Sequence, residues 1–390
     1  MPGELTQQRR VQSLEIVRFI AAFSVVVFHY QFYFFDSSIS QSKRPLYAVL
    51  SSFYNSGSYA VQWFWVLSGF VIFLNYADDI AIEKVPWRVF FFRRFARLYP
   101  LHLLTLILVC TLFACYKTLF HETYWLYAQE SNWSDLGLQL LFASNWFSTE
   151  FTFNGPIWSV SVEVLIYALF FFVVAMTRQN VIKASIIVCV LSVVVYYVAA
   201  YLHAGIEVWI AKCSFCFFGG GIISKVVAHI NLNPFGIAGY GYKRIAGWIA
   251  ACMFVAGLYA IRPAYALELA LPMVGICFVA SCSTTLERWP ILARINWIGD
   301  LTYGSYLWHF PIAFTLVIAM RVAGVDRGVA DSPPFLIGYL ALVFIVAAAS
   351  FLYIESPARR VIRSWENSHN NKIQQQSVVV RLFFRNSQEL

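Results

Sequence analysis

The sequence contains little charge. Only 12% of its 390 residues are Asp, Glu, Lys or Arg, whereas soluble globular proteins use about 25%. Hydrophobic residues make up 60% of the chain, which excludes an ordinary soluble enzyme. The net charge of +8 does not indicate nucleic-acid binding, because membrane proteins concentrate Lys and Arg in their cytoplasmic loops. We therefore expect a polytopic protein that sits in a lipid bilayer and has no nucleic-acid partner.

The patterns of a disulfide framework, a metal site and a secreted precursor are also lacking. Most of the eight cysteines lie inside apolar runs, where cysteine behaves as a small core residue. Cys213 and Cys216 have a CxxC spacing, but no second pair of ligands lies nearby, so we expect no metal. The first apolar run is too long for a cleavable signal peptide and lacks a small-residue cleavage site, so no leader is expected.

Apolar segments long enough to cross a bilayer are abundant. A spanning helix needs about 20 residues, and a shorter apolar stretch at 136–147 is expected to be interfacial or re-entrant. The sequence predicts an all-α transmembrane bundle over residues 1–363, followed by a polar tail, 364–390, that is too short for a core of its own. The ten predicted spans are 14–35, 58–76, 98–116, 157–176, 185–201, 208–223, 245–261, 265–282, 301–320 and 335–354.

The distribution of Lys and Arg predicts the orientation. With the N-terminus placed in the cytoplasm, the inside segments hold twenty of these residues and the outside segments hold seven. Cytoplasmic loops of membrane proteins carry such an excess. We therefore expect both termini to be cytoplasmic.

Two polar residues interrupt the first apolar run, which begins at Leu14. A charged side chain at the centre of a membrane helix costs roughly 2.5–3.5 kcal/mol on insertion scales, and such residues usually have a function. Arg18 and His29 are eleven positions apart, about 20° past three full helical turns. They should share one stripe of the helix. The alternative is that Arg18 reaches the nearer membrane surface and His29 forms a hydrogen bond within the bundle.

The fourth predicted span carries a carboxylate. Ser159 and Glu163 are four positions apart, so they share a helix face. Counted from opposite surfaces at about 1.5 Å per residue, Glu163 and His29 reach similar depths. A carboxylate beside a histidine would orient it as a general base. Glu163 could instead pair with another group or be protonated.

Two further groups of polar residues lie at or within the predicted spans. Arg94 and Arg97 lie three apart before the third span, and arginine suits phosphate recognition because its planar fork donates two parallel hydrogen bonds. An ordinary positive-inside anchor is the alternative. Tyr303, Tyr306 and His309 succeed one another at intervals of three in the ninth span, and so mark one helical side. Interfacial tyrosines and a packed histidine would give the same pattern.

Together these motifs resemble acyltransferase family 3. The family comprises membrane-bound O-acyltransferases that modify sugars of bacterial surface polysaccharides, such as lipopolysaccharide O-antigen, and some antibiotics. Two positions depart from the family pattern, because Gln62 and Val164 stand where relatives often carry acidic residues. The motifs are Arg18 with His29, the Trp65–Phe70 run, Arg94 and Arg97 before Tyr99–Pro100, Trp158–Glu163, Tyr303–His309, and Glu355–Pro357 with Arg359.

The resemblance implies a reaction. It is the transfer of an acyl group, most commonly acetyl, from cytoplasmic acyl-CoA to a hydroxyl of a glycan at the outer side of a bacterial inner membrane. His29, oriented by Glu163, would act as general base or carry the acyl group covalently. Ser159 and Trp158 are expected at the acceptor. We expect the donor to contact Arg18, Arg94, Arg97, Tyr303 and His309.

Two other classes of protein also place polar residues in a membrane. A transporter or flippase needs charges at mid-depth, but the sequence has no internal repeat and no paired set of broken helices. A purely structural membrane protein leaves Arg18, His29, Glu163 and His309 without a purpose. Substrate accumulation without chemical change would indicate the first class, and tolerance of substitution at all four residues would indicate the second.

Overall fold

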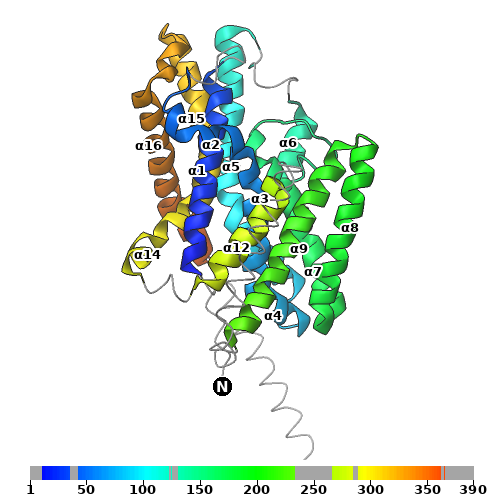
Figure 1. The fold of residues 1–390 in the computed structure, drawn as a ribbon. Helices are drawn as coiled ribbons and strands as arrows, with labels where there is room; N and C mark the ends of the chain where they lie inside the picture. Colours follow the sequence, from blue (N-terminus) through cyan, green and yellow to red (C-terminus); the bar gives the residue numbers. More distant parts are fainter. Residues whose placement is uncertain are drawn as a thin grey trace, which may run out of the picture.

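The chain folds into a bundle of helices (Figure 1). The computed structural model describes residues 11–35, 43–122, 124, 131–232, 266–283, 289–361 and 364. Over these residues the structure contains no strand, which confirms the predicted all-α class. The main helices are α1 (Gln12–Phe34), α2 (Tyr47–Ser56), α3 (Ala60–Ile72), α4 (Asp78–Ala81), α5 (Trp87–Phe120), α6 (Trp133–Leu140), α7 (Trp158–Thr177), α8 (Val181–Tyr201), α9 (Gly205–Leu232), α12 (Leu271–Ser281), α14 (Pro290–Ile295), α15 (Thr302–Val322) and α16 (Pro333–Ser350).

Short helical segments join or extend these helices. Three are single π-helical turns, which often mark functional sites, and the others are 3-10 turns. The π turns are η3 (Phe73–Ala77), η7 (Ala266–Ala270) and η10 (Phe351–Glu355), and the 3-10 turns are η2 (Gly57–Tyr59), η4 (Gly155–Ile157), η5 (Arg178–Asn180), η8 (Asn296–Leu301) and η9 (Arg327–Asp331).

The described residues contain seven helical runs that are long and apolar enough to cross a membrane. One of them, Gly155–Tyr201, holds both α7 and α8. The predicted span 265–282 corresponds to a shorter apolar helix, Glu268–Ser281, and the predicted span 245–261 and nearly all of the tail lie outside the described residues. The chain is a multi-pass membrane protein, and the count of ten spans stays a prediction. The runs are Gln12–Phe34, Tyr47–Ala81, Trp87–Phe120, Gly155–Tyr201, Gly205–His229, Pro290–Val322 and Pro333–Val361.

Several helices differ in length from their predicted segments. The sixth predicted span, 208–223, is part of the much longer α9. The predicted short stretch at 136–147 is helical only as α6, whose first turn is capped by Asn132 and Asp135 in a capping box. The Gln139 carbonyl of α6 lies 2.9 Å from Nε2 of His102 on α5. This eight-residue helix therefore packs against the bundle and is too short to span.

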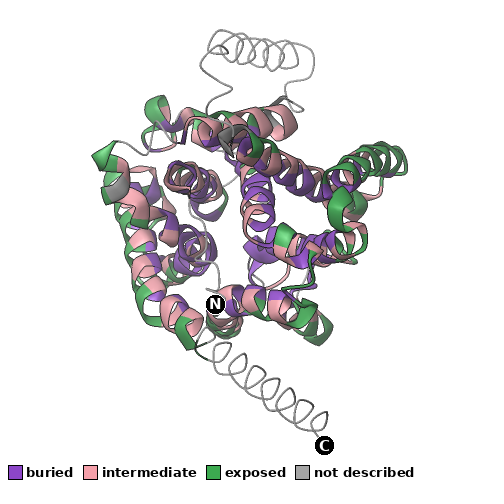
Figure 2. Cartoon of the chain, turned by 90° about the horizontal axis from the view of Figure 1, so that it is seen from below, coloured by how far each residue is buried: buried purple, intermediate pink, exposed green. Residues whose placement is uncertain are grey.

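The helix α1 runs through the middle of the site-forming part of the bundle. It packs against α2, α3 and α15, and α15 also packs against α5 and α16. On the other side of α3 lies α9, which packs in turn against α8. Figure 1 shows α16 and α8 at opposite edges. Figure 2 shows that buried residues gather on the inward faces of the helices and exposed residues on the outside.

Glycines allow α3 and α9 to approach closely. A Cβ atom at Gly69 would lie 1.8 Å from the Phe217 carbonyl oxygen, and one at Gly220 would lie 2.1 Å from the Val66 carbonyl oxygen. Neither position can accept a side chain without separating the helices. Such small-residue contacts are a common way to pack helices in a membrane, where the hydrophobic effect does not drive helix association.

The bundle has two ends that matter for the site. We call the end at which α1 begins the lower end, and the end at which α1 finishes the upper end, as they are oriented in Figure 1. Val11 and Arg359 line one common cavity, so the start of α1 and the chain after α16 meet there. At the upper end an ion pair joins Arg321 to Glu122. Hydrogen bonding to the Arg321 guanidinium holds the pKa of the Glu122 carboxyl below its usual range.

Candidate active site

A cavity of about 100 Å³ lies between α1, α3, α5, α7 and α15. Three arginines and one carboxylate line it: Arg18, Arg94, Arg97 and Glu163. With Ser159 and Tyr303, which also line it, the structure thus brings together six of the predicted site residues, which come from four separate helices. Removing charges from water is costly unless they are paired or bind a ligand, so this concentration of charge needs an explanation.

The three arginines have different partners. Arg18 donates from Nη1 to both oxygens of Glu15, at 3.0 and 2.8 Å. Arg94 donates to the hydroxyl of Tyr76 at 3.0 Å. Arg97 forms no hydrogen bond or ion pair with any residue that the structure describes. Its guanidinium is therefore the one of the three that keeps all its donors for a ligand.

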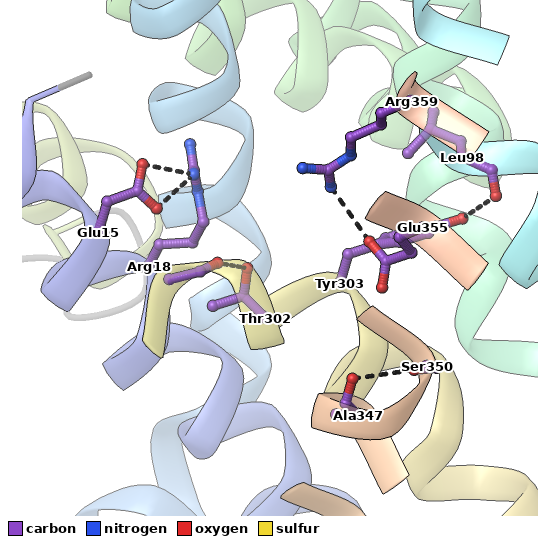
Figure 3. A network of polar contacts seen from close by, with 10 residues as sticks. Glu15, Arg18, Leu98, Thr302, Tyr303, Ala347, Ser350, Glu355 and Arg359 are labelled. Atoms are coloured by element: carbon purple, nitrogen blue, oxygen red, sulfur yellow. Dashed lines mark hydrogen bonds and ion pairs between the residues drawn. The ribbon is translucent and has the colours of Figure 1, made fainter. Parts of the chain in front are cut away.

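A second cavity, of about 50 Å³, extends the first toward the lower end. Arg18, Arg97 and Tyr303 line both cavities, so the two adjoin, and we call them together the arginine passage. The second cavity adds Arg359, which pairs with Glu355 at 3.2 Å. Figure 3 shows the Glu15–Arg18 and Glu355–Arg359 pairs on either side of Thr302 and Tyr303. Four guanidinium groups therefore line the passage, against the carboxylates of Glu15, Glu163 and Asp300.

Glu163 does not contact His29, contrary to the pair expected from their similar depths. Its Oε1 accepts a hydrogen bond of 2.7 Å from the hydroxyl of Tyr167, which lies 3.3 Å from the Ser68 hydroxyl. No hydrogen bond or ion pair joins Glu163 to His29, and both residues are described. Depth along two helices fixes height but not direction, and Glu163 faces the arginine passage.

His29 instead lies beside a second histidine. The ring centroids of His29 and His309 are 5.0 Å apart, and His309 is fully buried. Tyr33 lies against both rings, at 6.0 and 5.8 Å. Arg18 also faces α15, since Thr302 and Tyr303 share its cavities. The predicted stripe of Arg18 and His29 is therefore present, and it faces α15.

The hydrogen bonds of the two histidines define their tautomers. His29 Nδ1 lies 2.9 Å from the Val25 carbonyl, and His309 Nδ1 lies 2.7 Å from the Tyr306 carbonyl. A carbonyl oxygen only accepts, so each Nδ1 carries the hydrogen, and each Nε2 of the neutral ring keeps a lone pair. Nε2 of His309 is buried without a hydrogen-bond partner among the described residues. No described residue bonds Nε2 of His29 either.

Ser159 and Tyr306 connect the arginine passage to the histidines. Their hydroxyls are 2.7 Å apart, and the Tyr306 hydroxyl donates to the Pro156 carbonyl at 2.7 Å. Because this bond uses the only hydrogen of that hydroxyl, Ser159 donates to Tyr306. Both residues line the passage, while the Tyr306 carbonyl holds His309. The passage thus ends one helical turn from the histidine pair.

Of two further predicted site residues, Tyr303 lies in the arginine passage and Trp158 lies outside it. Tyr303 donates to the Leu98 carbonyl at 2.6 Å and lines the arginine passage. Trp158 does not line the passage. Its ring packs against Trp65 on α3 and Trp209 on α9, with centroids 5.9 and 4.5 Å away, where it helps to hold α7 in the bundle.

Comparison with known proteins identifies the chain's family. A family model described as an acyltransferase domain matches residues 11–354. The chain belongs to acyltransferase family 3. Its match includes nearly all of the arginine passage and both histidines, and it makes the chain an O-acyltransferase of the membrane.

Two curated relatives of this acyltransferase are similar at low identity. The acyltransferase MdmB from Streptomyces mycarofaciens is 22% identical over 392 residues, which cover 90% of this chain and 92% of MdmB. The peptidoglycan O-acetyltransferase OatA from Listeria monocytogenes is 23% identical over 395 residues, which cover 90% of this chain and 56% of OatA. No solved structure matches the acyltransferase.

Several residues of the site were not among the predicted site residues. Glu15 lies three positions before Arg18, and Tyr167 lies four positions after Glu163, so helical spacing gave a signal for both. Ser68 lies within the Trp65–Phe70 motif. Arg359 follows the Glu355–Pro357 motif, but its presence in the passage depends on how α16 returns to the start of α1, which spacing along one helix does not show.

Proposed function

We propose that this acyltransferase transfers an acetyl group from acyl-CoA, bound from the cytoplasm, to a hydroxyl of a glycan outside the membrane. The observation that carries the proposal is the histidine pair of α1 and α15, placed one helical turn beyond the arginine passage. The histidine pair can move a proton, and the arginine passage can hold an anion.

The arginine passage supports acyl-CoA as the donor. Acyl-CoA carries phosphates, and arginine binds phosphate through two parallel charge-assisted hydrogen bonds. Arg97 forms no bond with a described residue, so it can bind a phosphate without breaking an existing contact. The excess of Lys and Arg in the predicted inside segments supports a lower end that faces the cytoplasm.

The histidine pair supports general base catalysis. Nε2 of His29 would take the proton of the acceptor hydroxyl as its oxygen attacks the acyl carbon. The bond between the acyl carbon and sulfur then breaks, and the CoA thiolate takes the proton back from His29. The imidazolium formed meanwhile would lie beside the neutral ring of His309, whose buried Nε2 lone pair is an available hydrogen-bond acceptor.

Ser159, Tyr306 and Glu163 would serve the same reaction from the passage. The Ser159–Tyr306 bond fixes the turn that holds His309 in its tautomer. A catalytic role for Glu163 stays a prediction. Its hydrogen bond with Tyr167 supports a role in setting the charge of the arginine passage. His309 changes from a predicted donor contact to a partner of His29.

The experiment that tests the proposal compares surface glycans of cells with and without the gene by mass spectrometry. We expect acyl groups to disappear from one glycan and to return with the wild-type gene. Restoration should fail with His29→Ala at an equal level of protein in the membrane. Glycans with the same acylation in both strains would contradict the proposal.

A further inference from the structure

The upper end of the bundle contains a larger cavity, of about 520 Å³. Its walls come from the last residues of α1, the last turns of α15, and the segment that leads through η9 to α16. Phe34 and Phe35 supply aromatic rings, and Arg321, Arg327, Asp326 and Asp331 supply charges. None of the residues lining the arginine passage lines this cavity.

The histidine pair lies between the two regions on both helices that carry it. Along α1 the order is Arg18 in the passage, then His29, then Phe34 in the upper cavity. Along α15 the order is Tyr306, then His309, then Val317. At about 1.5 Å per residue, the upper cavity begins about 8 Å beyond His29 and about 12 Å beyond His309. A ligand in this cavity therefore approaches the pair from the side opposite to the passage.

The charges of the upper cavity suit a neutral ligand that is rich in hydroxyls. Two arginines and two aspartates line it, so their formal charges cancel. Arg321 is already held by Glu122 and Tyr116, and Oδ1 of Asp326 accepts from the Gly328 amide at 2.6 Å. Arg321 therefore already has a counter-ion, and one oxygen of Asp326 already has a hydrogen-bond donor.

Asp331 indicates that the ligand supplies a hydrogen-bond donor. Its Oδ1 is buried without a hydrogen-bond partner among the residues that the structure describes. An unmet buried acceptor costs about 1–3 kcal/mol, more if it is charged. A ligand hydroxyl can donate to it, whereas an ionised phosphate or carboxylate has no hydrogen to donate.

We propose that the upper cavity seats a neutral saccharide unit of the acceptor, with a hydroxyl bonded to Asp331 and the apolar face of the ring against the phenylalanines. This inference rests on the proposed function, since it assigns the acceptor side of the same reaction. The acceptor hydroxyl and the donor thioester would then reach His29 from opposite ends of α1.

The test fills the cavity chemically and can be carried out before the acceptor is identified. Val325 lines the cavity and is 42% exposed, while Val329 is 47% exposed, lies four residues further on and does not line it. Cells that make Val325→Cys or Val329→Cys are treated with a membrane-impermeant methanethiosulfonate that attaches a trimethylammonium-ethyl group to cysteine. Glycan acylation is measured before treatment, after it, and after the thiol is released by a reductant.

We expect treatment to lower acylation by Val325→Cys at least about tenfold relative to the same untreated cells, and the reductant to restore it. Acylation by Val329→Cys and by the wild type should not change. Binding of labelled acetyl-CoA to purified, modified Val325→Cys should equal that of the unmodified protein.

Three results would overturn the inference: full acylation by modified Val325→Cys, an equal loss with Val329→Cys, or failure of the reagent to label the Val325→Cys variant from outside. A failure of the proposed function looks different, because wild-type cells would then show no acylation that depends on the gene. An equal loss of acetyl-CoA binding would assign the cavity to the donor and also overturn the inference.

Discussion

The helix α8 and the contact between α1 and α15, which we call the α1–α15 seam, treat polar side chains in opposite ways. α8 exposes apolar residues, including Ile186, Ile187 and Val194, and its buried Ser192 bonds only to Ser214 and its own backbone. The seam buries His309 and Ser305 completely and carries the charge of Arg18. Helices in lipid can be apolar throughout, so a seam that accepts the cost of buried polar groups is where function is expected.

The largest expected effect concerns His29. Replacement with Ala removes the proposed base, and general base catalysis contributes about 10²–10⁴-fold, so glycan acylation should fall by at least about 10²-fold. A matched control is His102→Ala, because the His102 ring, like that of His29, bonds to a backbone carbonyl, that of Gln139, but lies outside the seam. Acylation per folded protein should survive that change. Equal losses of acylation in the two variants would contradict a specific role for His29.

A smaller effect is expected at His309. Its Nε2 would support the charged His29, and a hydrogen bond to a charged group contributes about 1.5–3 kcal/mol, so His309→Ala should lower kcat by about 10- to 100-fold. His309→Gln should recover part of the rate, because an amide oxygen can accept the same bond. Acetyl-CoA affinity should stay constant in both variants. If Gln and Ala are equally poor, or if donor affinity falls with kcat, His309 only shapes the fold.

The next effect separates donor binding from chemistry. Arg97→Ala should weaken acetyl-CoA binding about tenfold or more, since a charge-assisted bond contributes about 1.5 kcal/mol at least, and Arg97→Lys should restore only part of it. Titration of purified protein in detergent measures both. Arg178→Ala is the control, because Arg178 is exposed and pairs with Glu83 outside the passage. Unchanged donor affinity in correctly inserted Arg97→Ala would contradict the phosphate role.

The smallest effect is expected in α8. Ser192→Ala removes the bond of 3.0 Å between α8 and α9, which contributes about 0.5–1.5 kcal/mol to stability. The Tm should fall slightly, with no change in acylation per folded protein. A loss of acylation comparable to that of the seam variants would mean that α8 takes part in the reaction.

The sequence predicted where the seam residues lie on their own helix better than it predicted which residues of other helices they contact. Arg18 and His29 share a predictable stripe because both belong to one helix with a fixed period. The pairing of His29 with Glu163 was wrong in its geometry, because it compared depths on two helices whose relative rotation depends on packing. The contact between His29 and His309 could not be predicted for the same reason, because it depends on how α1 and α15 are rotated toward one another.

Charge and hydropathy predicted the rest of the fold only in part. The all-α class followed from composition, since a bilayer forces backbone groups to bond within helices or closed barrels. The close approach of α3 and α9 depends on Gly69 and Gly220 meeting backbone carbonyls, which a hydropathy profile does not register. Arg94 and Arg97 of the arginine passage could be predicted from their spacing, whereas Arg359 joins the passage through the return of the chain after α16.

The most direct test of the account measures from which side of the membrane acetyl-CoA is used. We place donor entry at the lower end of the seam and the reaction at His29. Membrane vesicles of both orientations, made from cells with wild-type protein or His29→Ala, are given isotope-labelled acetyl-CoA, and label in the glycan is counted. We expect label only in wild-type vesicles that present the cytoplasmic surface to the donor, at a level at least about 10²-fold above His29→Ala. Equal labelling from the other surface, or from His29→Ala vesicles, would contradict a donor that enters at the lower end and reacts at His29.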